Sequence, residues 1–297
     1  MDSIWAAIIF LLNMFFLLAA YYFLNAYLYF STTCIRPKKS GEEDAEEIRL
    51  PAIYDQIMIE GAAGKLSGYY RKGHKNKLVI LIHGWMDDAK SRLEDVSPYA
   101  ELGYHVLLCD LRAHGKSEGK YLGMGIADSM DLEAWVAAME ERLGETIEIV
   151  LDGVSFGAAA ILHLNPDFLK DHITAVIADS SYDSLGKIFR KMVHFSPKFM
   201  AGFYLSGIHI WGKLLGKYSL KKDHVEINIA QITVPVLLIG GALDKLVSID
   251  TQKKLQKACK GICELFIVER ASHAKASYVD REGYENRIKL FLNTYAE

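Results

Sequence analysis

The sequence is poor in residues that mark several classes of protein. It contains four cysteines and six prolines in 297 residues, and no long stretch is polar or repetitive. This composition excludes a largely disordered chain. The cysteines lack the second pair of Cys or His ligands that a structural zinc site requires. We therefore interpret all four as free thiols, which favours a reducing compartment; they are Cys34, Cys109, Cys259 and Cys263.

A large excess of charge of either sign is also absent, since 34 Lys and Arg residues stand against 37 Asp and Glu residues. The formal net charge is −3, which excludes the strongly basic composition that is typical of nucleic-acid-binding proteins. We accordingly expect no nucleic-acid partner. The chain is long enough for one large α/β domain or two small ones, and 51% of its residues are hydrophobic, which suffices for a sizeable core.

Charged residues are absent altogether from Ser3 to Cys34. Within this stretch, Ile4–Phe30 is dominated by Ile, Leu, Phe, Ala and Tyr, and it exceeds the roughly 20 helical residues that cross the hydrocarbon core of a bilayer. A buried core helix and a cleaved signal peptide are the alternatives, but a signal peptide requires a basic N-terminal region and a shorter apolar run. We therefore predict a transmembrane anchor over residues 1–30.

The two flanks of this run differ in charge. Arg36, Lys38 and Lys39 follow it, whereas Asp2 precedes it. Because basic flanks usually stay on the cytoplasmic side, we expect a single-pass protein of the cell membrane whose main domain lies in the cytoplasm. Five acidic residues between positions 42 and 47 then favour a solvated, charged linker over residues 31–50.

After residue 50, short apolar runs alternate with amphipathic segments such as Ile126–Leu143. Alternation of this kind predicts one α/β domain over residues 51–297, with a mainly parallel sheet covered by helices on both faces. In such sheets the ligand-binding residues gather in the loops at the carboxyl ends of the strands. The predicted strands are Tyr54–Glu60, Lys65–Lys72, Leu78–Ile82, His105–Cys109, Ile147–Leu151, Ala175–Ala178, Val234–Ile239 and Cys263–Val268.

The interval between the strands that end near Asp179 and begin at Val234 is too long for an ordinary connection. Its helical pattern predicts a cap insertion over about residues 182–230. Between Tyr182 and Lys222 it holds eight basic side chains and one acid, Asp183, interleaved with aromatic residues. Basic residues mixed with aromatic ones on helices are what contact with an anionic lipid surface requires, so we consider such contact as one interpretation of the cap. Alternatively, the aromatic residues cover the site and the lysines face solvent.

The pattern Gly-x-Ser-x-Gly occurs twice, at Gly115–Gly119 and Gly153–Gly157. A nucleophile elbow needs an apolar strand that runs into a sharp turn, followed by a helix that packs closely on the sheet. Ser155 meets these demands, because Ile147–Leu151 precedes it and an alanine-rich apolar run follows. Ser117 lies several residues beyond its strand among charged side chains, so we assign it to a polar loop and predict Ser155 as the nucleophile.

A serine nucleophile requires a base, and the base requires an orienting carboxylate. Downstream of Ser155, Asp244 follows one predicted strand and His273 follows the last, in the chain order that is typical of this arrangement. We therefore predict a Ser155–His273–Asp244 triad, with Asp179 as the alternative acid. Taken singly, Asp244 is also compatible with a helix cap and His273 with an ordinary surface residue.

A tetrahedral intermediate also needs two N–H donors for its oxyanion. The backbone N–H groups of Phe156, directly after the nucleophile, and of Trp85, in the loop after the first long strand, are the candidates. His83 precedes that loop, and we expect it to organise the loop rather than to act as a base. The chemistry implies no metal and no organic cofactor.

Together these residues resemble the α/β-hydrolase superfamily, and the resemblance covers nearly all of residues 51–297. Leu81–Trp85 resembles its oxyanion-loop motif, Asp110–Ser117 a structural loop motif, and Gly241–Val247 the motif that carries the acid. The apolar N-terminus, Tyr121–Gly125 and the elbow more narrowly resemble membrane-anchored bacterial hydrolases near peptidase family S9 and the serine aminopeptidases. Three positions depart from the superfamily pattern: Ala113 and Ser272 replace glycines, and Ser248 replaces a proline.

The resemblance implies esterase-like acyl transfer to water, with a small-molecule or lipid-like carboxylic ester as substrate. A serine aminopeptidase or amidase is the first alternative, but recognition of a peptide N-terminus requires a carboxylate in the cap, where Asp183 stands nearly alone. A catalytically idle, membrane-tethered binding protein is the second alternative. The presence of all three triad residues in order favours an enzyme.

Overall fold

The structure is a computed structural model, and it describes residues 2–35, 50–192, 198–220, 223 and 225–296. Its centre is an eight-stranded sheet of order β1-β2-β4-β3-β5-β6-β7-β8. The two outer pairs β1–β2 and β2–β4 are antiparallel, and every other neighbouring pair is parallel. The predicted strands are confirmed: β1 Tyr54–Gly61, β2 Gly64–Arg71, β3 Lys77–Ile82, β4 His105–Cys109, β5 Glu148–Val154, β6 Ala175–Asp179, β7 Val236–Gly241 and β8 Cys263–Val268.

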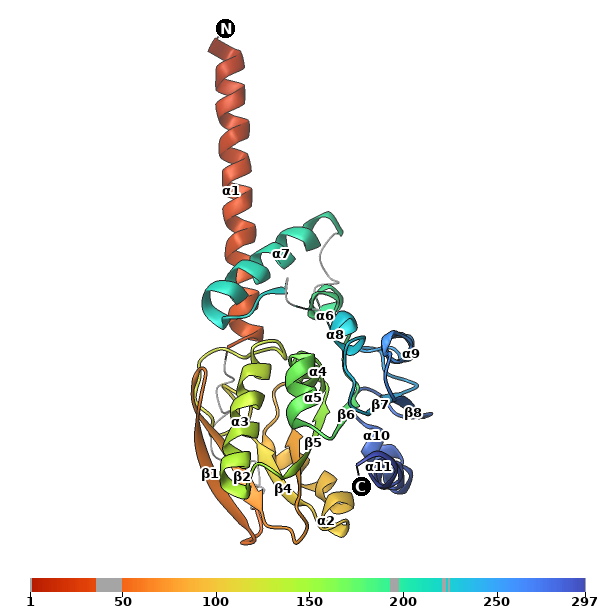
Figure 1. Cartoon of the computed structure of the whole chain (residues 1–297). Helices are drawn as coiled ribbons and strands as arrows, with labels where there is room; N and C mark the ends of the chain where they lie inside the picture. Colours follow the sequence, from red (N-terminus) through yellow and green to blue (C-terminus); the bar gives the residue numbers. More distant parts are fainter. Residues whose placement is uncertain (1, 36–49, 193–197, 221–222, 224, 297) are drawn as a thin grey trace.

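Helices cover both faces of this sheet (Figure 1). Successive residues of β3 point to opposite faces, and because both faces are covered all of its apolar side chains are fully buried. One face is packed by α3 (Asp128–Leu143), α4 (Phe156–Leu162), α5 (Pro166–His172), α8 (Val225–Ile229) and α9 (Ile249–Ala258). The other is packed by two 3₁₀ turns (Ala89–Arg92 and Glu94–Val96), α2 (Ser97–Glu101), α10 (Ala276–Val279) and α11 (Arg281–Tyr295).

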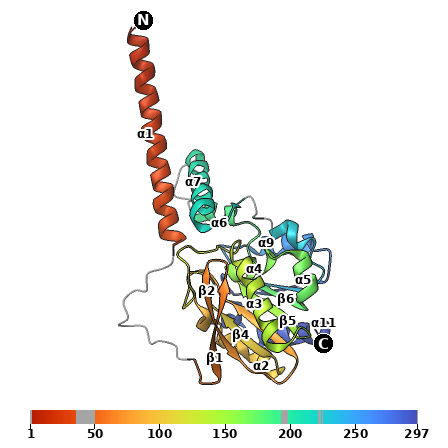
Figure 2. The same ribbon diagram turned by 60° about the vertical axis from the view of Figure 1, so that its left-hand side comes forward.

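The connection from β6 to β7 holds further helices in the interval where the cap is predicted. They are α6 (Leu185–Met192) and α7 (Lys198–Trp211), followed by a wide helical turn over Gly212–Gly216 and then by α8. Residues 193–197, 221, 222 and 224 of the predicted cap lie outside the described residues. Figures 1 and 2 both show α7 beside the domain-proximal half of the N-terminal helix, α1.

Helix α1 spans Asp2–Thr33, three residues beyond the predicted anchor. Within the described residues it is the one helix long and apolar enough to cross a membrane, over Ala7–Leu28; a signal sequence would pass the same test. The chain then joins the main domain at once, because the Leu122 N–H donates to the Cys34 carbonyl at 2.9 Å and Ile35 forms a β-bridge with Tyr121. The start of the predicted linker is therefore helical and domain-bound, and its residues 36–49 lie outside the described residues.

Candidate active site

The turn between β5 and α4 places Ser155 in a sparsely populated conformation for a non-glycine residue, with φ 54° and ψ −110°. The glycines on either side make the turn possible. A Cβ on Gly153 would lie 2.5 Å from the carbonyl carbon of Gly157, and a Cβ on Gly157 would lie 2.5 Å from the carbonyl oxygen of His83. Close packing against neighbouring backbone thus excludes side chains at both positions and leaves the Ser155 hydroxyl presented at the end of β5.

The three residues of the predicted triad lie in one hydrogen-bonded chain. Ser155 Oγ is 2.8 Å from His273 Nε2, and His273 Nδ1 is 2.7 Å from Asp244 Oδ2. The Asp244 carboxylate fixes the proton on Nδ1, so Nε2 is the acceptor that faces the serine. Three separate loops, after β5, β7 and β8, supply these groups.

Asp244 also caps its own loop. Its Oδ1 accepts hydrogen bonds from the N–H groups of Leu246 and Val247, both at 2.8 Å, while Oδ2 contacts His273. These bonds hold the loop before α9 and do not cap the helix, because the N-cap position of α9 is Ser248. Because two backbone donors hold the carboxylate, it has one orientation in which to hold the imidazole.

Asp179, the alternative acid, has a different partner. Its carboxylate accepts a hydrogen bond from Ser180 Oγ at 2.8 Å, and Ser180 Oγ in turn accepts from the N–H of Ala274, next to His273, at 3.3 Å. Burial raises the pKa of Asp179 to about 6, partly offset by the Ser180 hydrogen bond. Asp179 therefore supports the loop that carries His273 but does not contact the imidazole through any described hydrogen bond.

The two predicted oxyanion donors lie beside the serine. Trp85, Phe156 and Ser155 line the same cavity, and a Cβ on Gly84 would lie 3.6 Å from the Cβ of Ser155. Phe156 is the first residue of α4, where a backbone N–H has no carbonyl partner within the helix. The backbone on both sides of Ser155 is thus close enough to approach a bound carbonyl.

His83 holds the loop that carries Trp85. Its Nδ1 donates to the Gly84 carbonyl at 2.7 Å, and its Nε2 accepts from the Leu111 N–H at 3.0 Å. Burial, followed by the nearby His114, holds the pKa of His83 well below its usual range, so the ring is neutral and able to accept. His83 therefore ties the loops after β3 and β4 together, as the sequence predicted.

Ser117, in the second Gly-x-Ser-x-Gly, is fully buried. Its Oγ donates to the Asp110 carbonyl at 2.8 Å and accepts from the Ser67 N–H at 2.9 Å. These bonds join the loop after β4 to β2. Ser117 therefore has a structural role in the loop after β4. Its charged neighbours suggest an exposed position, but its side chain is buried.

A cavity of about 210 Å³ adjoins Ser155 and His273. Its wall is largely apolar, but beyond the triad five charged side chains and a tyrosine contribute to it. Pockets with a few placed polar groups orient their ligands through those groups. The residues are Asp87, Arg92, Asp95, Asp179, Lys275 and Tyr278.

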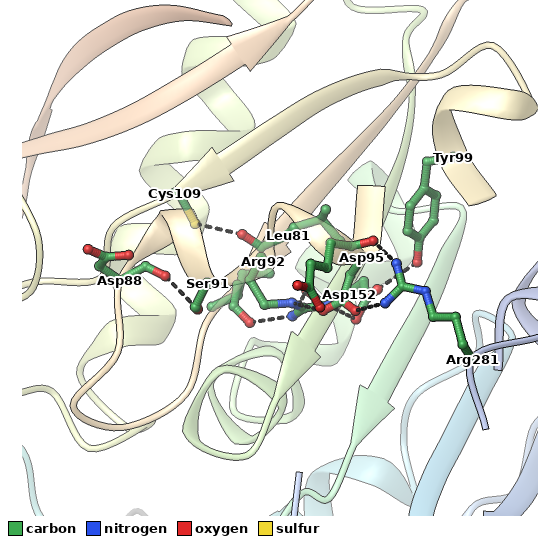
Figure 3. Close-up of polar contacts among 11 residues, drawn as sticks. Leu81, Asp88, Ser91, Arg92, Asp95, Tyr99, Cys109, Asp152 and Arg281 are labelled. Carbon is green, nitrogen blue, oxygen red and sulfur yellow. Dashed lines mark hydrogen bonds and ion pairs between the residues drawn. The ribbon is translucent and has the colours of Figure 1, made fainter. Parts of the chain in front are cut away.

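Arg92 lines this cavity, and Figure 3 shows the polar contacts that surround its guanidinium. Its guanidinium contacts Asp95 Oδ2 at 2.7 Å, Asp152 Oδ1 at 3.1 Å and the Ile82 carbonyl at 2.7 Å, while Tyr99 Oη donates to Asp152 Oδ2 at 2.6 Å. This buried network joins the loop after β3 to β5, directly below the elbow. No local motif links Arg92 to Asp152, so the sequence alone does not indicate this network.

Comparison with known proteins places this geometry in a wider group. A family profile described as the α/β hydrolase fold matches residues 77–220. The uncharacterized protein YqkD of Bacillus subtilis (strain 168) is 24% identical over 239 residues, which cover 80% of this chain and 78% of YqkD. The uncharacterized protein YfhR of Escherichia coli (strain K12) is 27% identical over 218 residues, 72% of this chain and 69% of YfhR.

Solved structures of esterases share the fold. The Pyrococcus furiosus esterase Pf2001 superposes with a TM-score of 0.68 at 25% identity, covering 88% of this chain and 99% of its own. A thermophilic esterase from Thermogutta terrifontis has a TM-score of 0.58 at 15% identity, covering 81% of this chain and 99% of its own, which shows the fold alone. The narrower resemblance to peptidase family S9 and the serine aminopeptidases stays a prediction.

Proposed function

Because the chain belongs to the α/β-hydrolase superfamily, we propose that it is a serine hydrolase that cleaves carboxylic esters through an acyl-enzyme on Ser155. The observation that carries this proposal is the hydrogen-bonded chain from Ser155 Oγ through His273 to Asp244, at 2.8 and 2.7 Å. Likeness to the esterase Pf2001 supports esters as the substrate class.

In the first half of the reaction, Ser155 Oγ attacks the ester carbonyl carbon while His273 Nε2 takes the hydroxyl proton. Asp244 stabilises the imidazolium that forms. Collapse of the tetrahedral intermediate breaks the bond to the alkoxy group, and His273 returns the proton to the leaving alcohol. The acyl group remains on Ser155.

In the second half, His273 takes a proton from water, and the resulting hydroxide attacks the acyl carbon. The carboxylic acid departs, and Ser155 recovers its proton. In both halves the N–H groups of Phe156 and Trp85 stabilise the oxyanion, a contribution that typically amounts to about 3 kcal/mol per donor.

An aminopeptidase or amidase has less support. Asp183, the one acid between Tyr182 and Lys222, forms ion pairs with Lys187 and, at 3.8 Å, with Lys254. A carboxylate that already holds two ammonium groups is a poor receptor for the N-terminus of a peptide. A catalytically idle binding protein is also disfavoured, because it has no need of a strained serine aligned with a base.

We further propose that α1 anchors the enzyme in the cell membrane by a single pass, with the hydrolase domain in the cytoplasm. The apolar side chains of its outer part project into open space, since Phe10, Leu11 and Leu17 are all more than 60% exposed. Such a surface is stable in a bilayer and costly in water. The basic residues after the helix support the cytoplasmic orientation.

The test of the proposed activity is a hydrolysis screen of the full-length protein in detergent or nanodiscs. Substrates are p-nitrophenyl esters from short to long acyl chains, with aminoacyl p-nitroanilides as the amide comparison. We expect turnover of esters that Ser155→Ala abolishes. Preferential turnover of the amides would favour the aminopeptidase alternative, and ester turnover that survives Ser155→Ala would refute the mechanism.

A further inference from the structure

The helix α1 contacts the cap as well as leading into the main domain. Its residue Ala26 is fully buried, although most of α1 is exposed. The residue that buries it is Gly207 of α7, where an added Cβ would lie 2.3 Å from the Cβ of Ala26. A small residue opposite another small residue lets two helices approach closely, as helices do inside membranes.

Aromatic and sulfur contacts extend this interface in both directions along α1. The ring of Trp211, at the end of α7, lies 4.9 Å from that of Phe23 and 4.8 Å from that of Tyr27. Further down, Tyr218 Oη donates to the buried Cys34 Sγ at 3.5 Å. From residue 23 to the end of α1 at residue 33 the interface runs for about 15 Å along the helix axis, and Cys34 follows directly.

The position of these contacts along α1 decides where α7 lies. Phe23, Ala26 and Tyr27 all belong to the apolar stretch Ala7–Leu28 that is long enough to cross a membrane. A helix that packs against the last turns of a membrane span must share the depth of those turns. Figures 1 and 2 agree with this placement, because α7 lies beside α1 and not against the sheet.

The composition of α7 fits that depth. Apart from Lys198 at its start and His209 near its end, its fourteen residues carry no ionisable acid or basic group. Ile210 and, just beyond it, Leu214 are 41% and 56% exposed. Lys213 and Lys217, which are both exposed, lie just after the end of α7, where their ammonium groups can reach lipid headgroups.

Other basic side chains of the cap are used within the protein. Lys191 Nζ donates to the Leu246 carbonyl at 2.7 Å, and Lys187 pairs with Asp183. The side chains of Lys198, Lys221 and Lys222 lie outside the described residues. The apolar contact with α1 therefore carries the argument, and the basic side chains add to it.

We propose that α7 is embedded in the cytoplasmic leaflet against α1, so that the lipid bilayer covers the outer surface of the cap. This inference rests on the proposed membrane anchor. A bilayer in this position brings esters that are dissolved in the leaflet to the cap, which makes a lipid-like ester the natural substrate class.

The test is tryptophan quenching by lipids with brominated acyl chains, using the full-length protein in nanodiscs. Trp211 reports on α7 and Trp5 on α1, whereas the other two tryptophans belong to the hydrolase domain, where Trp135 is buried and Trp85 lines the cavity beside Ser155. The variants are Trp211→Phe and Trp5→Phe, since phenylalanine keeps an aromatic ring in each contact. Labelling of Ser155 by a fluorophosphonate, measured on the same samples, reports separately on the proposed hydrolase chemistry.

We expect each substitution to remove a comparable share of the quenchable fluorescence. If Trp5→Phe lowers quenching and Trp211→Phe does not, α1 is in the membrane and α7 is not, which overturns the inference. If neither substitution changes quenching, the anchor itself is refuted and the inference falls with it. In either case, fluorophosphonate labelling of Ser155 tests the hydrolase proposal independently of the membrane contact.

Discussion

Ser155 Oγ lies 2.8 Å from His273 Nε2, although 118 residues separate the two in the chain. The contact arises because β5 and β8 run parallel, so that the loops after them meet at the same edge of the sheet. In the sheet, β6 and β7 lie between β5 and β8. The loop that carries Asp244 follows β7, which is the neighbour of β8. The fold thus brings the three groups together without any local sequence pattern between them.

The identity of the acid is the first prediction. Asp244→Asn should lower kcat for a p-nitrophenyl ester by about 10⁴-fold, since an amide no longer fixes the proton on Nδ1 of His273. Asp179→Asn is the matched control, because Asp179 contacts Ser180 instead, and we expect a far smaller loss. Near-normal activity in Asp244→Asn together with a collapse in Asp179→Asn would show that the acid has been assigned wrongly.

The elbow glycine gives the second prediction. Gly157→Ala would place a Cβ 2.5 Å from the His83 carbonyl oxygen. We expect a loss of about 1–3 kcal/mol in the free energy of unfolding, and slower ester turnover because the loop that carries Trp85 must move. Gly186→Ala serves as control, since its nearest neighbour lies at 3.5 Å. Thermal unfolding and initial rates measure both effects, and equal behaviour of the two variants would argue against a constrained elbow.

The third prediction concerns stability and pH. Burial raises the pKa of Asp179 to about 6 from 3.8, so the folded protein keeps a proton that the unfolded chain releases. Stability should therefore fall as pH rises from about 4 to 6, by up to about 3 kcal/mol from this group. Asp179→Asn removes this titrating group. The melting temperature of the variant, relative to that of the wild type, should therefore be higher at pH 8 than near pH 4, where the advantage should vanish. A difference in melting temperature between the variant and the wild type that does not change with pH would contradict a raised pKa for Asp179.

The contact between α1 and the cap gives the fourth prediction. Gly207→Leu should force α7 away from Ala26, whereas Gly202→Leu, on the same helix, places its Cβ in open space. If the cap works from the leaflet, Gly207→Leu should lower hydrolysis of a long-chain ester presented in nanodiscs while it spares a soluble short-chain ester. If Gly207→Leu lowers hydrolysis of both esters equally, or if Gly202→Leu has the same effect as Gly207→Leu, the contact between α1 and α7 does not govern access to a lipid substrate.

Much of the fold was predictable from the sequence, because strands buried on both faces must be apolar. The runs that form β3 and β5 through β7 are short and rich in Val, Ile or Leu for that reason. The triad residues were accessible to prediction by the same logic, since each follows a predicted strand. Gly153 and Gly157 marked the elbow because only glycine fits against the neighbouring backbone.

Other features depend on contacts that no local pattern encodes. Arg92 and Asp152 are 60 residues apart, and only the pairing of β3 with β5 brings them together. Asp152 lies too close to the elbow to orient a base, yet it anchors the buried network below Ser155. Likewise, an apolar run predicts a membrane helix but not which of its faces meets a neighbour, so the contact between Ala26 and Gly207 could come only from the structure.

The central claim is that Ser155 is the nucleophile, and covalent labelling tests it most directly. The full-length protein is treated with a fluorophosphonate, and the modified peptide is mapped by mass spectrometry. We predict a single adduct on Ser155, lost in Ser155→Ala and retained in Ser117→Ala, because Ser155 Oγ faces the His273 imidazole whereas Ser117 Oγ donates to the Asp110 carbonyl. An adduct on Ser117, or no adduct in folded wild-type protein, would contradict the account.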